Sequence, residues 1–256
     1  MTTANPRHYS DGPAYDRSTG RWSEQLAREL VPWLGARRDA RWLDVGCGTG
    51  AVSDAIMDLA WPGQVTGIDS SEGFLEVARR KVPSAHFDVG DAGSLPYPDA
   101  SFEAVVSALV VALLPDPPAA VAQMARVTTP GGVVGLLAWD RDRYLQREYW
   151  EAAEEVGAGG READRIDSAE ALGQLLVGAG LRDLQTRLLT ARVIFEGFDA
   201  YWDSLLGRKG QVTAHFEGQP GAKQAAIRES VRRRVEPKPG AKVPVEASAW
   251  AVRARR

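Results

Sequence analysis

The sequence is poor in the residues that build disulfide frameworks and metal sites. It has one cysteine, Cys47, and three histidines among 256 residues. A single cysteine cannot form an intrachain disulfide, so we expect a reducing compartment, the cytoplasm. We find no cluster of histidine, cysteine and acidic residues at the spacing of metal ligands, and therefore expect no metal.

The sequence also lacks an excess of basic residues and any long apolar run. Lysine and arginine number 31 against 34 acidic residues, which gives a formal net charge of −3. Proteins dedicated to nucleic acid are usually basic over a broad surface, so nucleic acid is not an expected partner. No apolar run is long enough to span a bilayer, and the first residues lack the apolar core of a signal peptide. We expect no membrane association and no export by that route.

A dense glycine motif stands out at residues 41–51, where a short apolar strand leads into Gly46, Gly48 and Gly50. Glycine lets a backbone turn sharply and lie against a ligand. The start of the helix predicted next offers unpaired N–H groups to that ligand. The motif therefore predicts a nucleotide-binding turn.

The turn alone does not decide which nucleotide binds. Gly46, Gly48 and Ala51 also satisfy the pattern of dinucleotide-binding turns. Asp44 lies two residues before the first glycine, where a carboxylate can face a cationic or amino-bearing ligand. This position favours an amino-acid nucleoside such as S-adenosylmethionine.

The rest of the chain alternates strand and helix patterns. After the strand at the glycines, we expect strands at 64–69, 85–89, 102–107, 133–139, 181–195 and 247–254. The expected helices lie at 23–34, 51–59, 72–81, 119–127, 144–156 and 171–179, with two more in the insert that precedes the last strand. This order predicts an α/β fold, with a doubly wound, seven-stranded, mostly parallel sheet and an antiparallel last strand.

We expect one domain over residues 1–256, with parts of different roles. The parts are an N-terminal arm and helix over the cofactor (1–40), a cofactor-binding core (41–140), and helical inserts that form a substrate lid (141–166 and 197–240). An insert of about fifty residues is too long for a simple hairpin, so it must have structure of its own.

Two acidic residues follow strands at the edge where open α/β sheets bind ligands. Asp69 ends the strand at 64–69, 19 residues after Gly50, where a carboxylate can accept hydrogen bonds from both ribose hydroxyls of a nucleoside. A dinucleotide site would place an acid similarly. Asp91 follows the strand at 85–89, in the sequence Gly-Asp-Ala.

Residues 43–50, Leu-Asp-Val-Gly-Cys-Gly-Thr-Gly, resemble the first motif of the class I S-adenosylmethionine-dependent methyltransferases. Residues 64–69, 90–96 and 126–132 resemble later motifs of that family, in order and at suitable spacing. The sequence is similar to the small-molecule type, such as the methyltransferases of ubiquinone and menaquinone biosynthesis. The resemblance implies S-adenosyl-L-methionine as cofactor, with S-adenosyl-L-homocysteine as product.

The residue patterns and the resemblance together give a set of expected cofactor contacts. They are Trp22, Asp44, Gly46, Cys47, Gly48, Gly50, Asp69, Ser70, Asp91, Ala92 and Ser107. By resemblance, Asp91 accepts from the adenine amino group, the Ala92 N–H meets a ring nitrogen, and Ser107 lies beside the methionine end. Ser70 or Ser71 can instead cap the following helix.

The expected acceptor is a small, partly aromatic or apolar molecule, methylated on oxygen, nitrogen or carbon. The expected substrate contacts are Tyr15, Trp139, Tyr201 and Trp202. Relatives frequently carry a histidine in the stretch that corresponds to residues 108–114, but here that stretch is apolar. His215 in the insert is the candidate general base, and an incidental lid histidine is the alternative. We expect a monomer or a homodimer.

Two other functions are compatible with the glycine turn. One is an NAD(P)-dependent oxidoreductase, but no tyrosine is followed by lysine four residues later, and Asp44 and Asp91 would be unexplained. The other is a protein of the same fold that binds S-adenosylmethionine without transferring a methyl group. Methyl transfer has no obligatory residue, so the sequence leaves this alternative open.

Overall fold

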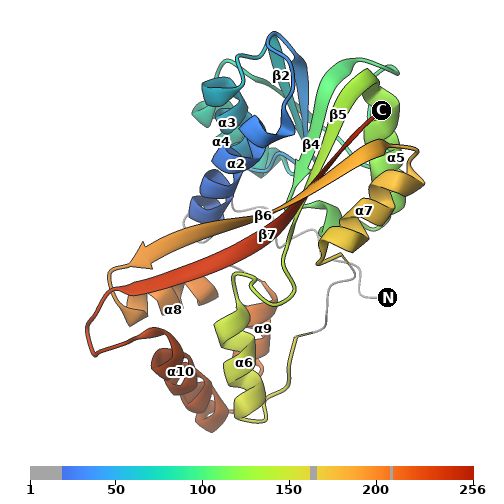
Figure 1. The fold of residues 1–256 in the computed structure, drawn as a ribbon. Helices are drawn as coiled ribbons and strands as arrows, with labels where there is room; N and C mark the ends of the chain where they lie inside the picture. Colours follow the sequence, from blue (N-terminus) through green and yellow to red (C-terminus); the bar gives the residue numbers. More distant parts are fainter. Residues whose placement is uncertain (1–18, 162–165, 208–209) are drawn as a thin grey trace.

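The computed structural model describes residues 19–161, 166–207 and 210–256, and a seven-stranded sheet runs through it (Figure 1). The strands, in the order in which they lie in the sheet, are β3 (His86–Val89), β2 (Gln64–Asp69), β1 (Arg41–Val45), β4 (Phe102–Ala108), β5 (Thr128–Trp139), β7 (Val243–Arg255) and β6 (Arg182–Phe195). The pairs from β3 to β5 are parallel, whereas β7 is antiparallel to both β5 and β6. The predicted doubly wound sheet with an antiparallel last strand is confirmed.

Helices cover both faces of this sheet. They are α2 (Arg21–Leu34), α3 (Ala51–Leu59), α4 (Glu72–Lys81), α5 (Pro117–Val127) and α7 (Ala169–Gly178), with the short η3 (Val111–Leu113) after β4. Helices α2 and α3 pack on one face, and α5 and α7 on the other (Figure 1). The strands between them read as nearly continuous apolar runs because both faces of the sheet are buried.

Side-chain caps fix the starts of three helices. The Ser71 side chain accepts from the Phe74 N–H at the start of α4, and the Asp116 carboxylate accepts from the Ala119 N–H at the start of α5. The Ser168 hydroxyl caps α7 in the same way. Each cap satisfies a backbone donor that would otherwise be unpaired in the first turn. Ser71, rather than Ser70, is thus the cap of α4, and α5 and α7 begin at Pro117 and Ala169, shortly before their predicted starts at 119 and 171.

The strand predicted at 133–139 begins earlier than predicted and includes residues 130–132. Strand β5 begins at Thr128 and continues through these residues, with an irregularity in its pairing to β4. Gly131 has a φ of +77° and its N–H donates to the Arg256 carbonyl, so the kink stays paired to the end of the chain. Pro-Gly-Gly is typical of a turn, but pairing with the end of the chain overrides the local preference.

A second group of helices lies beside the far halves of β6 and β7, which project beyond the other strands (Figure 1). This helical group consists of α6 (Arg147–Glu155), α8 (Phe198–Leu206), α9 (Gln211–Glu217) and α10 (Gly221–Val235). Ion pairs from Arg233 and Arg234 to Glu155 tie α10 to α6. Helix α9 was not predicted, because seven residues with only Val212 buried give no periodic apolar pattern.

Across the three described ranges, no helix combines the length and apolar character needed to cross a bilayer.

Candidate active site

The parallel strands bring most of the predicted cofactor residues to one edge of the sheet. The chain leaves β1 toward β2 and β3 on one side, and returns to β4 and β5 on the other. Open α/β sheets bind ligands at such a reversal of strand order, outside the carboxyl ends of the strands. The glycine turn follows β1, Asp69 ends β2, Asp91 follows β3, and Ser107 lies near the end of β4.

The glycine turn is closed on one side and open on the other. Gly46, Gly48 and Gly50 all have positive φ angles, of +72°, +54° and +85°. A Cβ atom on Gly46 would lie 2.6 Å from Cγ1 of Val110, in the segment after β4. Among the described residues, a Cβ atom on Gly48 would meet only the Phe74 ring, at 4.0 Å. Gly48 is therefore where the turn leaves room for a ligand.

Asp69 ties this turn to β2. Its Oδ2 accepts from the Gly48 N–H at 2.9 Å, and its Oδ1 accepts from the Ser71 N–H at 2.9 Å. Burial raises the pKa of the Asp69 carboxyl, and the backbone N–H groups act in the opposite direction. The two hydrogen bonds fix the carboxylate beside Gly48, with lone pairs left to accept from a ligand.

Asp44 is buried beneath the turn, with 1% of its surface exposed. Ser53 of α3 donates its hydroxyl to Asp44 Oδ2 at 2.8 Å. Burial raises the pKa of the Asp44 carboxyl to about 7, and the nearby Asp69 adds to this effect. Asp44 therefore gains and loses its proton near neutral pH.

This raised pKa predicts a pH dependence of stability. Below the ordinary pKa of 3.8, Asp44 is protonated in both the folded and the unfolded protein. As pH rises toward 7, the unfolded state loses its proton first, so the contribution of Asp44 to stability falls. Asp44→Asn keeps an acceptor for Ser53, and its stability relative to the parent should rise by roughly 2 kcal/mol between pH 5 and pH 8.5. Urea unfolding of the ligand-free proteins at several pH values measures this difference in stability, and Asp58→Asn, at an exposed position, is the control. If the stability of the parent and of Asp44→Asn changed with pH in the same way, the prediction would be wrong.

The remaining predicted cofactor residues at this edge differ in exposure. Asp91 is exposed, and its Oδ1 accepts from the Gly93 N–H at 2.8 Å, while Ala92 is buried. Ser70 is exposed, so its hydroxyl is open to solvent or a ligand. Ser107 is buried, and its Oγ finds no hydrogen-bond partner in the residues that the structure describes.

Cys47 lies inside the glycine turn and is buried. Burial raises the pKa of its thiol well above the ordinary value, so the reactive thiolate is disfavoured. Its sulfur would lie 2.9 Å from a Cβ atom on Gly67. Cys47 therefore fills space between β1 and β2, and its expected contact with the cofactor stays a prediction.

Trp22 and Trp139, two aromatic residues predicted to contact a ligand, lie next to the sheet. Trp22 begins α2 and is buried, with its ring centroid 5.7 Å from that of Phe195. Trp139 is half-buried at the carboxyl end of β5. Tyr15 lies outside the described residues. Direct contact of these side chains with a ligand stays a prediction.

Tyr201 and Trp202 lie within the helical group. Both are buried, and Trp202 stacks against Phe198 at 5.8 Å and meets Phe216 edge to face at 5.2 Å. The Tyr201 hydroxyl is buried without a hydrogen-bond partner among the described residues. Tyr201 and Trp202 therefore contribute to the core of the helical group, and their contact with an acceptor stays a prediction.

His215, the predicted general base, has partners on both ring nitrogens. Nε2 lies 3.0 Å from the Ala158 carbonyl, and Nδ1 lies 2.7 Å from the Tyr149 hydroxyl. A carbonyl can only accept, so this network assigns the proton to Nε2 and makes Tyr149 the donor to Nδ1. His215 would have to release Tyr149 before it could take a proton from an acceptor.

In the described ranges no cluster of three histidine, cysteine or acidic residues could hold a metal.

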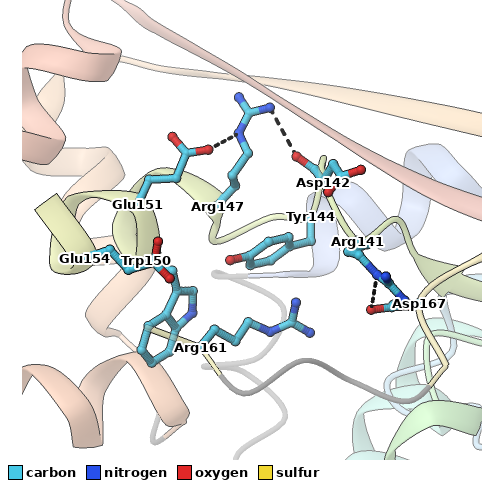
Figure 2. Close-up of a pocket in the computed structure, with 9 residues that line it drawn as sticks. All are labelled: Arg141, Asp142, Tyr144, Arg147, Trp150, Glu151, Glu154, Arg161 and Asp167. Carbon is cyan, nitrogen blue, oxygen red and sulfur yellow. Dashed lines mark hydrogen bonds and ion pairs between the residues drawn. The ribbon is translucent and has the colours of Figure 1, made fainter. Parts of the chain in front are cut away.

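The structure also contains a cavity that sequence reasoning missed. It lies between the segment after β5 and helix α6, and Tyr144, Arg147 and Trp150 are among its walls (Figure 2). The only local signal was the density of arginine and aromatic residues between Asp140 and Trp150.

The glycine turn and its surrounding strands have counterparts in known proteins. Residues 43–136 match the Methyltransferase domain family. The chain is 42% identical over 142 residues to a malonyl-acyl-carrier-protein O-methyltransferase of Serratia marcescens, over 52% of this chain and 55% of that protein. It is 40% identical over 114 residues to a demethylmenaquinone methyltransferase of Renibacterium salmoninarum, over 44% of this chain and 46% of that protein. The chain thus spans about half the length of these curated relatives.

A solved structure resembles nearly the whole fold. A proposed methyltransferase of Bacillus halodurans C-125 superimposes with a TM-score of 0.59 at 20% identity, over 90% of this chain and 97% of that one. At this identity the likeness concerns the fold. The sequence matches cover residues 43–136 and about half of the chain, and they agree with the resemblance of the glycine turn to the class I S-adenosylmethionine-dependent methyltransferases.

Proposed function

We propose that this chain transfers a methyl group from S-adenosylmethionine to a small-molecule acceptor and releases S-adenosylhomocysteine. The observation that carries the proposal is the pairing of Asp69 with the glycine turn. The carboxylate is fixed by the Gly48 N–H at 2.9 Å, at the place where the turn leaves room for a ligand. A carboxylate there suits the two ribose hydroxyls of a nucleoside.

The other residues of this edge fit the same ligand. The buried Ser107 hydroxyl lacks a partner in the described part of the chain, and a polar ligand group at the end of β4 would satisfy it. Asp91 is exposed after β3, where it can accept from the amino group of adenine. Asp44 below the turn favours a ligand with a positive charge over one with a pyrophosphate. These features support S-adenosylmethionine rather than a dinucleotide.

When bound, S-adenosylmethionine supplies a methyl group on a sulfonium that is its own leaving group. The protein's task is then to hold the acceptor in line with that group and to exclude water. The apolar segment after β4, which includes η3, offers a wall for a carbon skeleton. We propose that the helical group of α6, α8, α9 and α10 forms the substrate lid. A general base is needed only for a protonated nucleophile, and His215 is the candidate for that role.

The charge of the chain and the relatives both argue against a nucleic-acid acceptor. The formal net charge of −3 gives no broad basic surface for a polyanion. The two curated relatives are named for methyl transfer to malonyl-acyl-carrier protein and to demethylmenaquinone, neither of which is a nucleic acid.

Methyl transfer can be tested with S-adenosylmethionine labelled in its methyl group. We expect the purified protein to label molecules in a small-metabolite extract and to leave tRNA, DNA and bulk protein unlabelled. Efficient labelling of a macromolecule, with none of small molecules, would refute the proposed acceptor class. Cofactor binding without label transfer to any fraction would favour the non-transferring alternative.

The role of Asp69 gives a quantitative prediction. Asp69→Ala should weaken binding of S-adenosylmethionine by about 1.5 to 3 kcal/mol, because a charged acceptor of two hydrogen bonds is lost. Isothermal calorimetry measures the change. Asp58→Ala serves as the control, because Asp58 forms an exposed pair with Arg28. If the parent and a folded Asp69→Ala variant bound S-adenosylmethionine with equal affinity, Asp69 would not be a cofactor contact.

A further inference from the structure

A cavity of about 330 Å³ lies on the carboxyl-end side of the sheet, between the segment that follows β5 and helix α6 (Figure 2). Tyr144, Arg147 and Trp150 form part of its wall, together with Glu154, which lies beside Trp150 on α6, and Arg161 (Figure 2). The Arg161 guanidinium is 4.3 Å from the centroid of the Tyr144 ring. Arg161 thus covers one face of Tyr144, and the other side chains of the wall enclose a volume large enough for a small ring system.

The charges around the cavity are largely neutralised by one another. Arg141 donates two hydrogen bonds to Asp167, at 3.0 and 2.9 Å. Arg147 pairs with Glu148 at 2.6 Å and lies 3.7 Å from Glu151. The lining as a whole contains three arginines and four carboxylates, a formal charge of −1. A ligand that is itself an anion would therefore gain no net attraction here.

Two hydrogen-bond donors in this lining are buried without a hydrogen-bond partner among the described residues, and one of them, Arg147 Nε, lies 3.7 Å from Glu151 Oε1. The indole Nε1 of Trp150 and the Nε of Arg147 have no hydrogen-bond partner in the chain as far as the structure describes it. Trp150 is 5% exposed, and Figure 2 shows the nitrogen-bearing edge of its indole facing Tyr144 and Arg161. A buried N–H without an acceptor is unfavourable, so a ligand oxygen atom that accepts its hydrogen bond would contribute favourably to the binding free energy.

We propose that this cavity binds the acceptor through a flat, conjugated ring that carries a neutral carbonyl oxygen. The carbonyl accepts a hydrogen bond from Trp150 Nε1, and the ring packs against the aromatic walls. This inference rests on the proposed function, because it names the class of acceptor for the same methyl transfer. A carboxylate in place of the carbonyl is disfavoured by the net negative lining.

Three probes of nearly equal size test the class of ligand on the unmodified protein. They are para-hydroxyacetophenone, which has a neutral carbonyl, para-ethylphenol, which lacks it, and para-hydroxybenzoate, which is an anion. Equilibrium binding should be about tenfold tighter for the ketone than for either of the other two. Equal binding of the ketone and the ethyl compound, or tightest binding of the benzoate, would overturn the proposal.

The variant Trp150→Phe keeps an aromatic ring but removes the N–H. We expect the ketone's advantage over para-ethylphenol to fall to within twofold, while the matched control Trp61→Phe, at an exposed site, keeps it. A Trp150→Phe variant that folds and retains the full preference would refute the assigned contact. If that variant does not fold, the three-probe comparison on the parent still decides. Binding of S-adenosylmethionine to the parent protein is measured by calorimetry in the same series. If the parent does not bind S-adenosylmethionine, the proposed function is refuted, whereas the order of the three probe affinities tests the cavity separately.

Discussion

Replacing Gly46 with alanine is expected to lower the free energy of unfolding by roughly 4 kcal/mol and to abolish cofactor binding. Gly46 has a φ of +72°, a region that costs a side chain conformational energy. In addition, its Cβ would lie 2.6 Å from Val110 Cγ1, so the segment after β4 would have to move. That segment and the turn form adjacent walls of the candidate cofactor site, so binding should fail together with packing. Urea unfolding and calorimetry measure the two effects.

Two other glycines separate the causes of this effect. Gly131→Ala introduces the same backbone strain at φ +77°, but no atom of the part of the chain that the structure describes lies within 4 Å of the new Cβ, so it should cost only about 1 kcal/mol of stability. Gly48→Ala should also cost little stability but weaken the cofactor, because its Cβ would project into the open side of the turn. A Gly46→Ala variant as stable as Gly131→Ala would show that Val110 does not close the turn.

Replacing Trp202 with alanine should lower the free energy of unfolding by roughly 3 to 5 kcal/mol. The side chain is 5% exposed and packs against the rings of Phe198, Phe216 and Tyr149, from three helices of the helical group. Removing it would leave a large cavity among side chains that cannot all collapse into it. Thermal and urea unfolding test this expectation.

The same variant decides whether Trp202 also contacts the acceptor. If its role is packing alone, kcat/KM at a temperature where the variant is folded should stay near that of the parent. A large loss of kcat/KM with stability nearly unchanged would assign it to the substrate. Trp61→Ala, at an exposed tryptophan, is the matched control for loss of an indole.

Much of the fold follows from local chemistry and could be predicted. The caps at Ser71, Asp116 and Ser168 are determined by hydrogen bonds within three residues, so the sequence around each is sufficient. The placement of Asp69 near the glycine turn followed from the alternation of strands and helices, since parallel strands end at one edge of the sheet.

The parts that sequence reasoning missed depend on residues far apart in the chain. The Tyr149–His215 hydrogen bond joins side chains 66 residues apart, and nothing near His215 indicates that partner. The approach of Val110 to Gly46 likewise brings together two loops that follow different strands. Both contacts are products of tertiary packing, and no short window of sequence contains them. The cavity beside α6 is different, because its lining residues all lie between Arg141 and Asp167, and what the sequence does not show is how this stretch folds around a cavity.

The proposed function depends most on the identity of the ligand at the glycine turn, and calorimetric titration of the unmodified protein tests this identity directly. We expect S-adenosylhomocysteine to bind with one-to-one stoichiometry, to compete with S-adenosylmethionine, and to lose affinity in Asp69→Ala. Under the same conditions NAD⁺ and NADP⁺ should give no binding heat. Binding of NAD⁺ or NADP⁺ with no response to S-adenosylhomocysteine would contradict the account and assign the turn to a dinucleotide.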